Sequence, residues 1–225
     1  MTGESREVSK NPLARAPEVG GNMLRGLLET AINGTAMVPG AKSAAAKHLV
    51  KKGSAEDAIE SLVLTHIGLA GAQGFVTSLG GLPTLAVTLP ANIAGLAVVQ
   101  VRLIATIAHL RGYDIDSPRV RTAMIVCLMG RDGVRRLIDD GVLPSTPLAI
   151  ATAPMFDATL DHLVSERVLG ELVGRIGGRR AGLLFARRIP LLGGGVGGAM
   201  DGYSTIEIGN FAREVFVTRR RITAG

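Results

Sequence analysis

The sequence predicts an all-α protein, a compact multi-helix bundle in which two glycine-rich helical hairpins form the centre. No segment shows the two-residue alternation of apolar and polar side chains that marks a half-buried strand. Apolar residues instead recur at helical spacing, and glycine or proline follows most of these runs as a stop signal. At 225 residues the chain is long enough to bury one sizeable core.

The start of the chain differs in composition from the rest. Residues 1–18 mix charge, serine and proline without periodicity, which predicts a disordered N-terminal tail. Residues 19–221 carry the helical periodicity and are assigned to a single domain. Because the tail has no apolar h-region, we expect no secretory signal and a location on the cytoplasmic side of the cell membrane.

Three helices are expected in the first part of the domain. Leucine and isoleucine at helical spacing predict a helix that ends at Asn33-Gly34, and a second helix runs from Ala41 to Lys52. Gly53 supplies the C-terminal cap of the second helix. Ser54 followed by Asp57 resembles a capping box, which predicts that a third helix begins there.

Glycines recur every third residue along this third helix, at Gly68, Gly71 and Gly74. Each costs about 1 kcal/mol of helix propensity relative to alanine, so we expect a groove in which another backbone packs closely and offsets the loss. A second glycine-rich run near the end of the chain has the same interpretation. The predicted helix-packing glycines are Gly68, Gly71, Gly74, Gly194, Gly197 and Gly198.

Stop signals divide the remaining chain into further helices. Ser117-Pro118 has the form of an N-cap followed by the first helical residue. The clearest amphipathic pattern begins at Pro154, where leucine and valine fall on one stripe and charged residues lie off it. The expected helical spans, in chain order, are residues 90–112, 118–130, 133–140, 154–172, 179–188 and 193–221.

Composition limits how the chain can meet a membrane. Between Glu60 and Arg102 there is no Asp, Glu, Lys or Arg, yet the aromatic content is 3% and Trp is absent, so no aromatic belt marks a spanning helix. Insertion of residues 82–101 as a span remains an alternative, because its apolar and polar contributions nearly balance. Cys127, the one cysteine, lies in an apolar run and is expected to be a small core side chain.

Two blocks of small and apolar residues stand out by their order along the chain. The first contains Gly74–Pro83, Leu89-Pro90, Gln100–Arg102, Ile107–His109 and Gly112–Asp114. The second contains Ile189–Gly198, Asp201 and Ile208–Ala212. Together they resemble the EcsC protein family over residues 55–218. The resemblance implies a bacterial protein associated with membrane or envelope processes, and it carries over no catalytic residues, because the family has no assigned reaction.

Several polar residues lie within or beside the apolar, glycine-rich regions that should form the core. The predicted buried polar residues are Arg102, His109, Asp114, Asp201, Glu207 and Asn210. Because an unpaired buried charge is costly, we expect Arg102 to pair with Asp201 or Glu207 and to fix helix register. The alternative is that Asp114, Asp201 and Glu207 form the polar centre of an enzyme.

Two other patterns could indicate a phosphate site or a metal site, but each also has a structural explanation. Residues 193–198 are not expected to bind phosphate, since no strand precedes them and no Gly-Lys-Ser/Thr follows. Asp157, Asp161 and His162 have a spacing that metal ligands can use on one helix face. Both aspartates also fall near a helix start, where the macrodipole favours negative charge. We therefore expect no metal, no cofactor and no catalytic residue.

The basic residues give the chain a net charge of +6 and favour contact with an anionic surface. Clusters occur at Lys47 with Lys51 and Lys52, and at Arg131 with Arg135 and Arg136, among other places. Nucleic acid is disfavoured because no reading motif or interleaved aromatic residues accompany the charge. The candidates for contact with lipid headgroups are Arg179, Arg180, Arg187, Arg188, Arg219, Arg220 and Arg221.

These patterns predict a non-enzymatic helical protein that binds the inner face of the cell membrane or anionic lipid peripherally, as an accessory to a transport or envelope process. A membrane protein is a second expected partner. The alternative is a soluble helical enzyme, a hydrolase with an Asp/Glu/His centre, and an ordinary solvated basic surface also stays open. Oligomeric state is not predicted.

Overall fold

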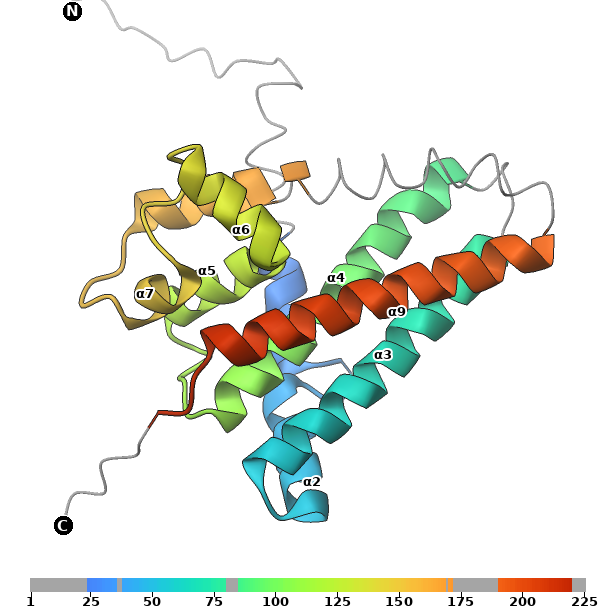
Figure 1. Ribbon diagram of the computed structural model, residues 1–225, viewed down its shortest axis with the longest axis horizontal. Coiled ribbons are helices and arrows are strands. Elements are labelled where there is room, and N and C mark those ends of the chain that lie inside the picture. The colour runs from blue at the N-terminus through green and yellow to red at the C-terminus, as the bar shows by residue number, and fades with distance from the viewer. Residues whose placement is uncertain (1–23, 36–37, 80–84, 169, 172–189, 220–225) are drawn as a thin grey trace, which may run out of the picture.

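The computed structural model describes residues 24–35, 38–79, 85–168, 170–171 and 190–219, and in this part of the chain the protein is all-α, as predicted (Figure 1). An isolated bridge between Gly34 and Pro39 is the only strand-like pairing among these residues. The N-terminal tail lies outside the described residues. So does the helix expected at residues 179–188.

Three long helices make up the larger part of the fold: α3 (Ala55–Leu79), α4 (Leu85–Leu110) and α9 (Pro190–Val215). Helix α9 lies alongside α3 for much of its length, and α4 contacts both (Figure 1). Helix α2 (Ala41–Lys52) packs against α3 and α4 through Ala41, Ala44 and Ala45.

Shorter helices pack at one end of the long ones (Figure 1). They are α5 (Pro118–Cys127), α6 (Gly130–Asp139) and α7 (Pro147–Thr152), with helical segments at residues 24–33 and 158–168. Residues 122–129 are all buried, so the end of α5 lies in the core. Cys127 is a buried core side chain, as expected, and burial raises the pKa of its thiol.

Helices α3 and α9 approach each other at glycine. A Cβ atom added to Gly198 would lie 2.7 Å from the carbonyl oxygen of Gly71, and one added to Gly74 would lie 2.8 Å from that of Gly197. Real Cβ atoms do not come so near a backbone oxygen, so these positions exclude any larger residue. Around Gly68, by contrast, a Cβ atom would meet nothing within 4 Å.

The glycine contact therefore joins helices that are far apart in sequence, through Gly71 and Gly74 on α3 and Gly197 and Gly198 on α9. The predicted pair of glycine-rich hairpins is not confirmed. Residues 172–189, which would precede α9 in the second hairpin, lie outside the described residues, as do the surroundings of Gly194.

Several helix ends agree with the sequence signals and others shift. The amide of Asp57 donates to Ser54 Oγ at 3.1 Å, and Gly53 closes α2 with φ at 81°, so both predicted caps form. Helix α4 begins five residues before Pro90, earlier than the proline signal predicted. Helix α9 ends at Val215, earlier than the expected 221.

Candidate functional site

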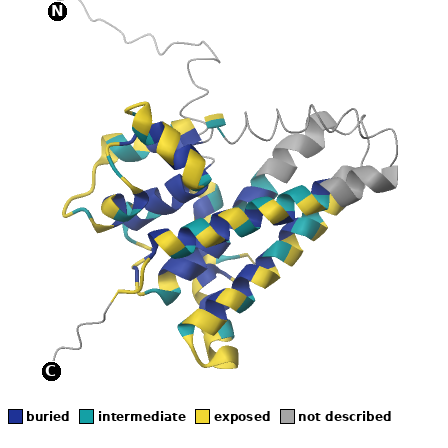
Figure 2. Ribbon diagram, in the orientation of Figure 1, coloured by how far each residue is buried: buried dark blue, intermediate teal, exposed yellow. Residues whose placement is uncertain are grey.

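The last turn of α2 exposes apolar and basic side chains together. Val50 is 87% exposed and Leu49 is 40% exposed, while Lys47, Lys51 and Lys52 are also at the surface. We call these five residues the lysine tip. The tip protrudes because only the alanine face of α2 packs on the rest of the protein, and Figure 2 shows the turn between α2 and α3 as mostly exposed.

The lysine tip is followed by the start of α3, where Glu56, Asp57 and Glu60 are exposed, and beyond these residues the helix is uncharged. From residue 61 to residue 79 the helix contains no Asp, Glu, Lys or Arg. Leu64 is 66% exposed, Leu69 is 44% exposed and Phe75 is 40% exposed. We call these three residues the outer face of α3; Leu64 is the most exposed of them, and Phe75 lies at its edge beside Gly198 of α9.

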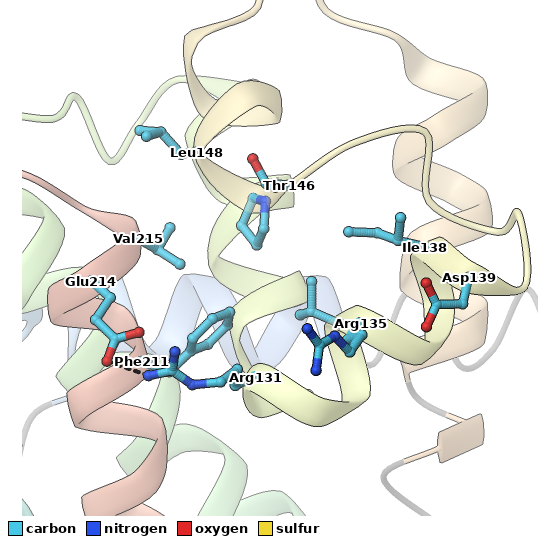
Figure 3. A pocket seen from close by; sticks show the side chains of 11 residues that line it. Arg131, Arg135, Ile138, Asp139, Thr146, Leu148, Phe211, Glu214 and Val215 are labelled. Atoms are coloured by element: carbon cyan, nitrogen blue, oxygen red, sulfur yellow. Dashed lines mark hydrogen bonds and ion pairs between the residues drawn. The ribbon is translucent and has the colours of Figure 1, made fainter.

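A separate pocket of about 470 Å³ opens between α6, α7 and α9 (Figure 3). Its apolar lining comes from Val134, Ile138, Pro147, Leu148, Phe211 and Val215. Arg131 and Arg135 project from α6 into this region, and Arg131 forms an ion pair with Glu214 on α9. We call this the α6–α9 pocket. Two members of the basic cluster at residues 131–136 therefore border an apolar hollow.

Of the predicted lipid-binding arginines, only Arg219 is described, and it is engaged within the protein. Its guanidinium lies over the Tyr113 ring, with Cζ 5.3 Å from the ring centroid, and its backbone amide donates to the carbonyl oxygen of Arg111. Tyr113 in turn makes an edge contact with Phe216 at 5.0 Å. Arg179, Arg180, Arg187, Arg188, Arg220 and Arg221 lie outside the described residues.

The structure corrects the expected burial of several polar residues. His109, Asp114, Glu207 and Asn210 are exposed, because each falls on the outward face or at the end of its helix. Arg102 and Asp201 are half-buried. Among the described residues Arg102 has no carboxylate within ion-pair distance, and burial lowers its pKa, so the expected pairing with Asp201 or Glu207 does not occur there. Asp201 instead packs against Gly74 on α3.

Sequence reasoning missed the polar residues that are buried between the long helices. Gln100 on α4 is 3% exposed, and its Nε2 donates to Ser204 Oγ at 3.2 Å and lies 3.4 Å from Thr205 Oγ1, both on α9. A neutral amide thus joins α4 to α9 where an ion pair was expected. The available signal was the position of Gln100 within a run that has no charged residue.

His66 on α3 is also buried, at 1% exposure. Its Nδ1 donates to the carbonyl oxygen of Leu62 at 2.8 Å, which leaves Nε2 as a buried acceptor with no partner among the described residues. The pKa of His66 is lowered to about 4, chiefly by burial and also by the nearby Arg102 and His48, while the hydrogen bond to Leu62 opposes the shift. The imidazole is therefore neutral in the folded protein near pH 7.

The aspartates with metal-like spacing have structural roles. Asp157 caps the helix at residues 158–168, since its Oδ1 accepts from the amides of Thr159 at 2.9 Å and Leu160 at 3.0 Å. Asp161 accepts from Thr122 Oγ1 at 2.6 Å and pairs with Arg25 at 3.1 Å. The described part of the chain contains no group of three His, Cys, Asp or Glu side chains placed to hold a metal ion.

Within the described residues no helix combines the length and the apolar character that crossing a bilayer requires. Comparison with known proteins gave no significant match to a family model, to a curated protein or to a solved structure. The resemblance to the EcsC family remains a prediction from the sequence.

Proposed function

We propose that the protein is a non-enzymatic accessory to a transport or envelope process that associates peripherally with an anionic membrane at the inner face of the cell membrane. The lysine tip and the outer face of α3 form the contact surface. The observation that carries the proposal is the exposure of Val50, an apolar residue at 87%, beside Lys51 and Lys52. Apolar side chains next to basic ones suit the boundary between lipid headgroups and acyl chains.

The lysines alone have an ordinary structural explanation, because basic residues near a helix C-terminus are stabilised by the helix macrodipole. That explanation does not account for an apolar residue exposed among them. Nor does it account for the exposure of Leu64, Leu69 and Phe75 on the next helix. The joint occurrence of both features on successive helices favours a membrane surface over an ordinary solvated one.

The expected affinity is modest. Each lysine near an anionic leaflet contributes about 1 kcal/mol, and burial of one valine side chain contributes about 1.5 kcal/mol or more. Three lysines and Val50 together supply about 4–5 kcal/mol, which corresponds to a dissociation constant of about 1 mM. Stable attachment therefore needs the additional apolar area of the outer face of α3.

The three carboxylates that suggested an enzyme do not lie together. Asp114 and Glu207 are exposed on different elements, and Asp201 faces α3. No shared centre of these carboxylates is present in the described part of the chain, so no observation there favours a hydrolase over the membrane-binding role.

Flotation with vesicles tests the proposal. The protein should float with vesicles of phosphatidylglycerol and phosphatidylcholine at low salt, and less with phosphatidylcholine alone. Adding about 1 M salt, which shortens the screening length to about 3 Å, should remove the part of binding that depends on charge. Lys51→Glu combined with Lys52→Glu should weaken binding at least about tenfold.

The matched control reverses two charges elsewhere. Arg136 on α6 and Arg167 in the helix at residues 158–168 are exposed, and these two helices lie away from α2 (Figure 1). Arg136→Glu with Arg167→Glu changes net charge equally but should leave flotation close to that of the unchanged protein. Equal loss in both double variants would mean that net charge alone drives binding, and the lysine tip would not be the contact surface.

A further inference from the structure

The α6–α9 pocket lies outside the surface proposed for membrane contact, and nothing in the proposed function uses it. Its volume of about 470 Å³ falls in the range of small-molecule sites, and most of its lining is apolar. Phe211 and Ile138 pack against the core but are only half-buried, so part of their apolar surface is left to line the pocket.

The charged side chains around the pocket indicate which head group a ligand would carry. Arg131 is neutralised by its ion pair with Glu214, a contact that joins α6 to α9 (Figure 3). Arg135 has no carboxylate within ion-pair distance among the described residues, although Asp139 follows it one turn later on the same helix. One guanidinium therefore remains available beside the apolar lining, and a guanidinium binds carboxylate or phosphate oxygens through paired N–H donors.

We propose that the α6–α9 pocket binds a single-chain amphiphile, an alkyl chain that ends in a carboxylate or a phosphate. The chain would lie against Ile138, Leu148 and Phe211, and the anionic head would bind Arg135 at the rim. A polyanion such as a nucleotide fits less well, because the carboxylates of Asp139 and Glu214 also line the pocket and Arg135 is the one lining arginine without an ion pair among the described residues.

A chain-length series measures whether the lining binds an alkyl chain. Isothermal titration calorimetry with straight-chain carboxylates from hexanoate to dodecanoate, below their micelle concentrations, should show saturable binding. Affinity should rise about fourfold with each added methylene until the pocket is filled, and then stop rising. Binding should also show a negative heat-capacity change, the signature of apolar burial. Absence of saturable binding across the series would overturn the proposal.

The role of Arg135 is tested by comparing ligands that differ only in the head group. Decanoate and decyl phosphate should bind at least about fivefold more tightly than decanol. Arg135→Gln should remove this preference and leave decanol binding unchanged. The matched control is Arg136→Gln, since Arg136 is the next residue on α6, is exposed and does not line the pocket. Equal binding of decanol and decanoate to the unchanged protein would rule out an anion-binding rim.

Two further variants locate the binding. Leu148→Trp should fill the pocket and reduce decanoate affinity at least about tenfold, with a circular dichroism spectrum that confirms the fold. If neither Leu148→Trp nor Arg135→Gln changes decanoate binding, the ligand binds elsewhere and the assignment is wrong. Titration with a lysophospholipid distinguishes a membrane-derived amphiphile from a free fatty acid, both of which belong to the proposed class. Tighter binding of the lysophospholipid than of decanoate identifies a membrane-derived ligand. Weaker binding identifies a free fatty acid.

Amphiphile binding in the α6–α9 pocket is independent of the proposed membrane contact. Lys51→Glu with Lys52→Glu should bind decanoate like the unchanged protein, because neither residue lines the pocket. Conversely, Arg135→Gln should float with anionic vesicles as the unchanged protein does. Either proposal can therefore fail without the other.

Discussion

At the scale of single residues, glycine determines how closely α3 and α9 approach. The space around each glycine differs sharply: Gly198 faces the carbonyl oxygen of Gly71, whereas Gly68 faces open space. The glycines that recur every third residue along α3 therefore differ in role: Gly71 contacts α9, whereas Gly68 has no packing role. The sequence pattern alone treats them alike.

Gly198→Ala should destabilise the protein by about 1–3 kcal/mol, because the new methyl group would lie 2.7 Å from a backbone oxygen that cannot rotate away. Gly68→Ala is the matched control and should stabilise by up to about 1 kcal/mol through helix propensity. Urea denaturation measures both. A stabilising effect at Gly198 would show that α3 and α9 are further apart than described.

The buried His66 predicts a dependence of stability on pH. The unfolded side chain titrates near 6.5 and the folded one at about 4, so between these values the unfolded chain binds more protons. Its contribution to stability is fully present above pH 6.5 and is lost as pH falls toward 4. The loss attributable to this group is roughly 3 kcal/mol.

Denaturation at pH 6.5 and at about pH 4 measures this effect. His66→Gln removes the titrating group and should flatten the change in unfolding free energy across that window, relative to the unchanged protein. His162→Gln is the control, since His162 is exposed and its partner is Glu166 on the same helix. The same slope in His66→Gln would assign the pH dependence to other groups.

At the scale of an element, the helix at residues 158–168 depends on its cap. Asp157 accepts hydrogen bonds from two amides that would otherwise lack partners, so Asp157→Ala should cost about 1 kcal/mol. Asp157→Asn keeps the accepting oxygen and should recover most of the loss. Thermal denaturation distinguishes the two, and an equal loss in both variants would indicate that charge, not capping, explains this residue.

At the scale of the whole molecule, Arg111 joins three parts of the chain. Its guanidinium donates to Glu56 Oε2 at 2.8 Å, near the start of α3, and to Thr218 Oγ1 at 2.6 Å, beyond α9. Its carbonyl oxygen accepts from the amide of Arg219 at 3.0 Å. Arg111 itself follows α4, so one residue holds the ends of all three long helices together.

Arg111→Gln should therefore lower the free energy of unfolding by about 1–2 kcal/mol, since two charge-assisted contacts are lost. It should also increase amide hydrogen exchange at residues 216–219, which depend on that contact. Arg136→Gln, at an exposed arginine, should change neither measurement. Unchanged exchange at residues 216–219 would mean that the aromatic contact of Tyr113 with Phe216 suffices to hold this segment.

The local features of the fold could be predicted from the amino-acid sequence. The all-α class, the cap at Ser54 and Asp57, the left-handed glycine at Gly53 and the core position of Cys127 all follow from propensity and spacing over a few residues. The lysine cluster of the tip was also visible as a basic cluster, although its apolar partner Val50 was not.

Tertiary structure alone decided which distant residues meet. Glycine spacing predicts that a backbone packs on α3 but cannot identify α9, because a small residue carries no information about its partner. Whether a polar residue is buried depends on which helix face turns inward, so Gln100 is buried while Glu207 is exposed. The α6–α9 pocket arises from three helices brought together by long-range packing, and no local pattern encodes such a meeting.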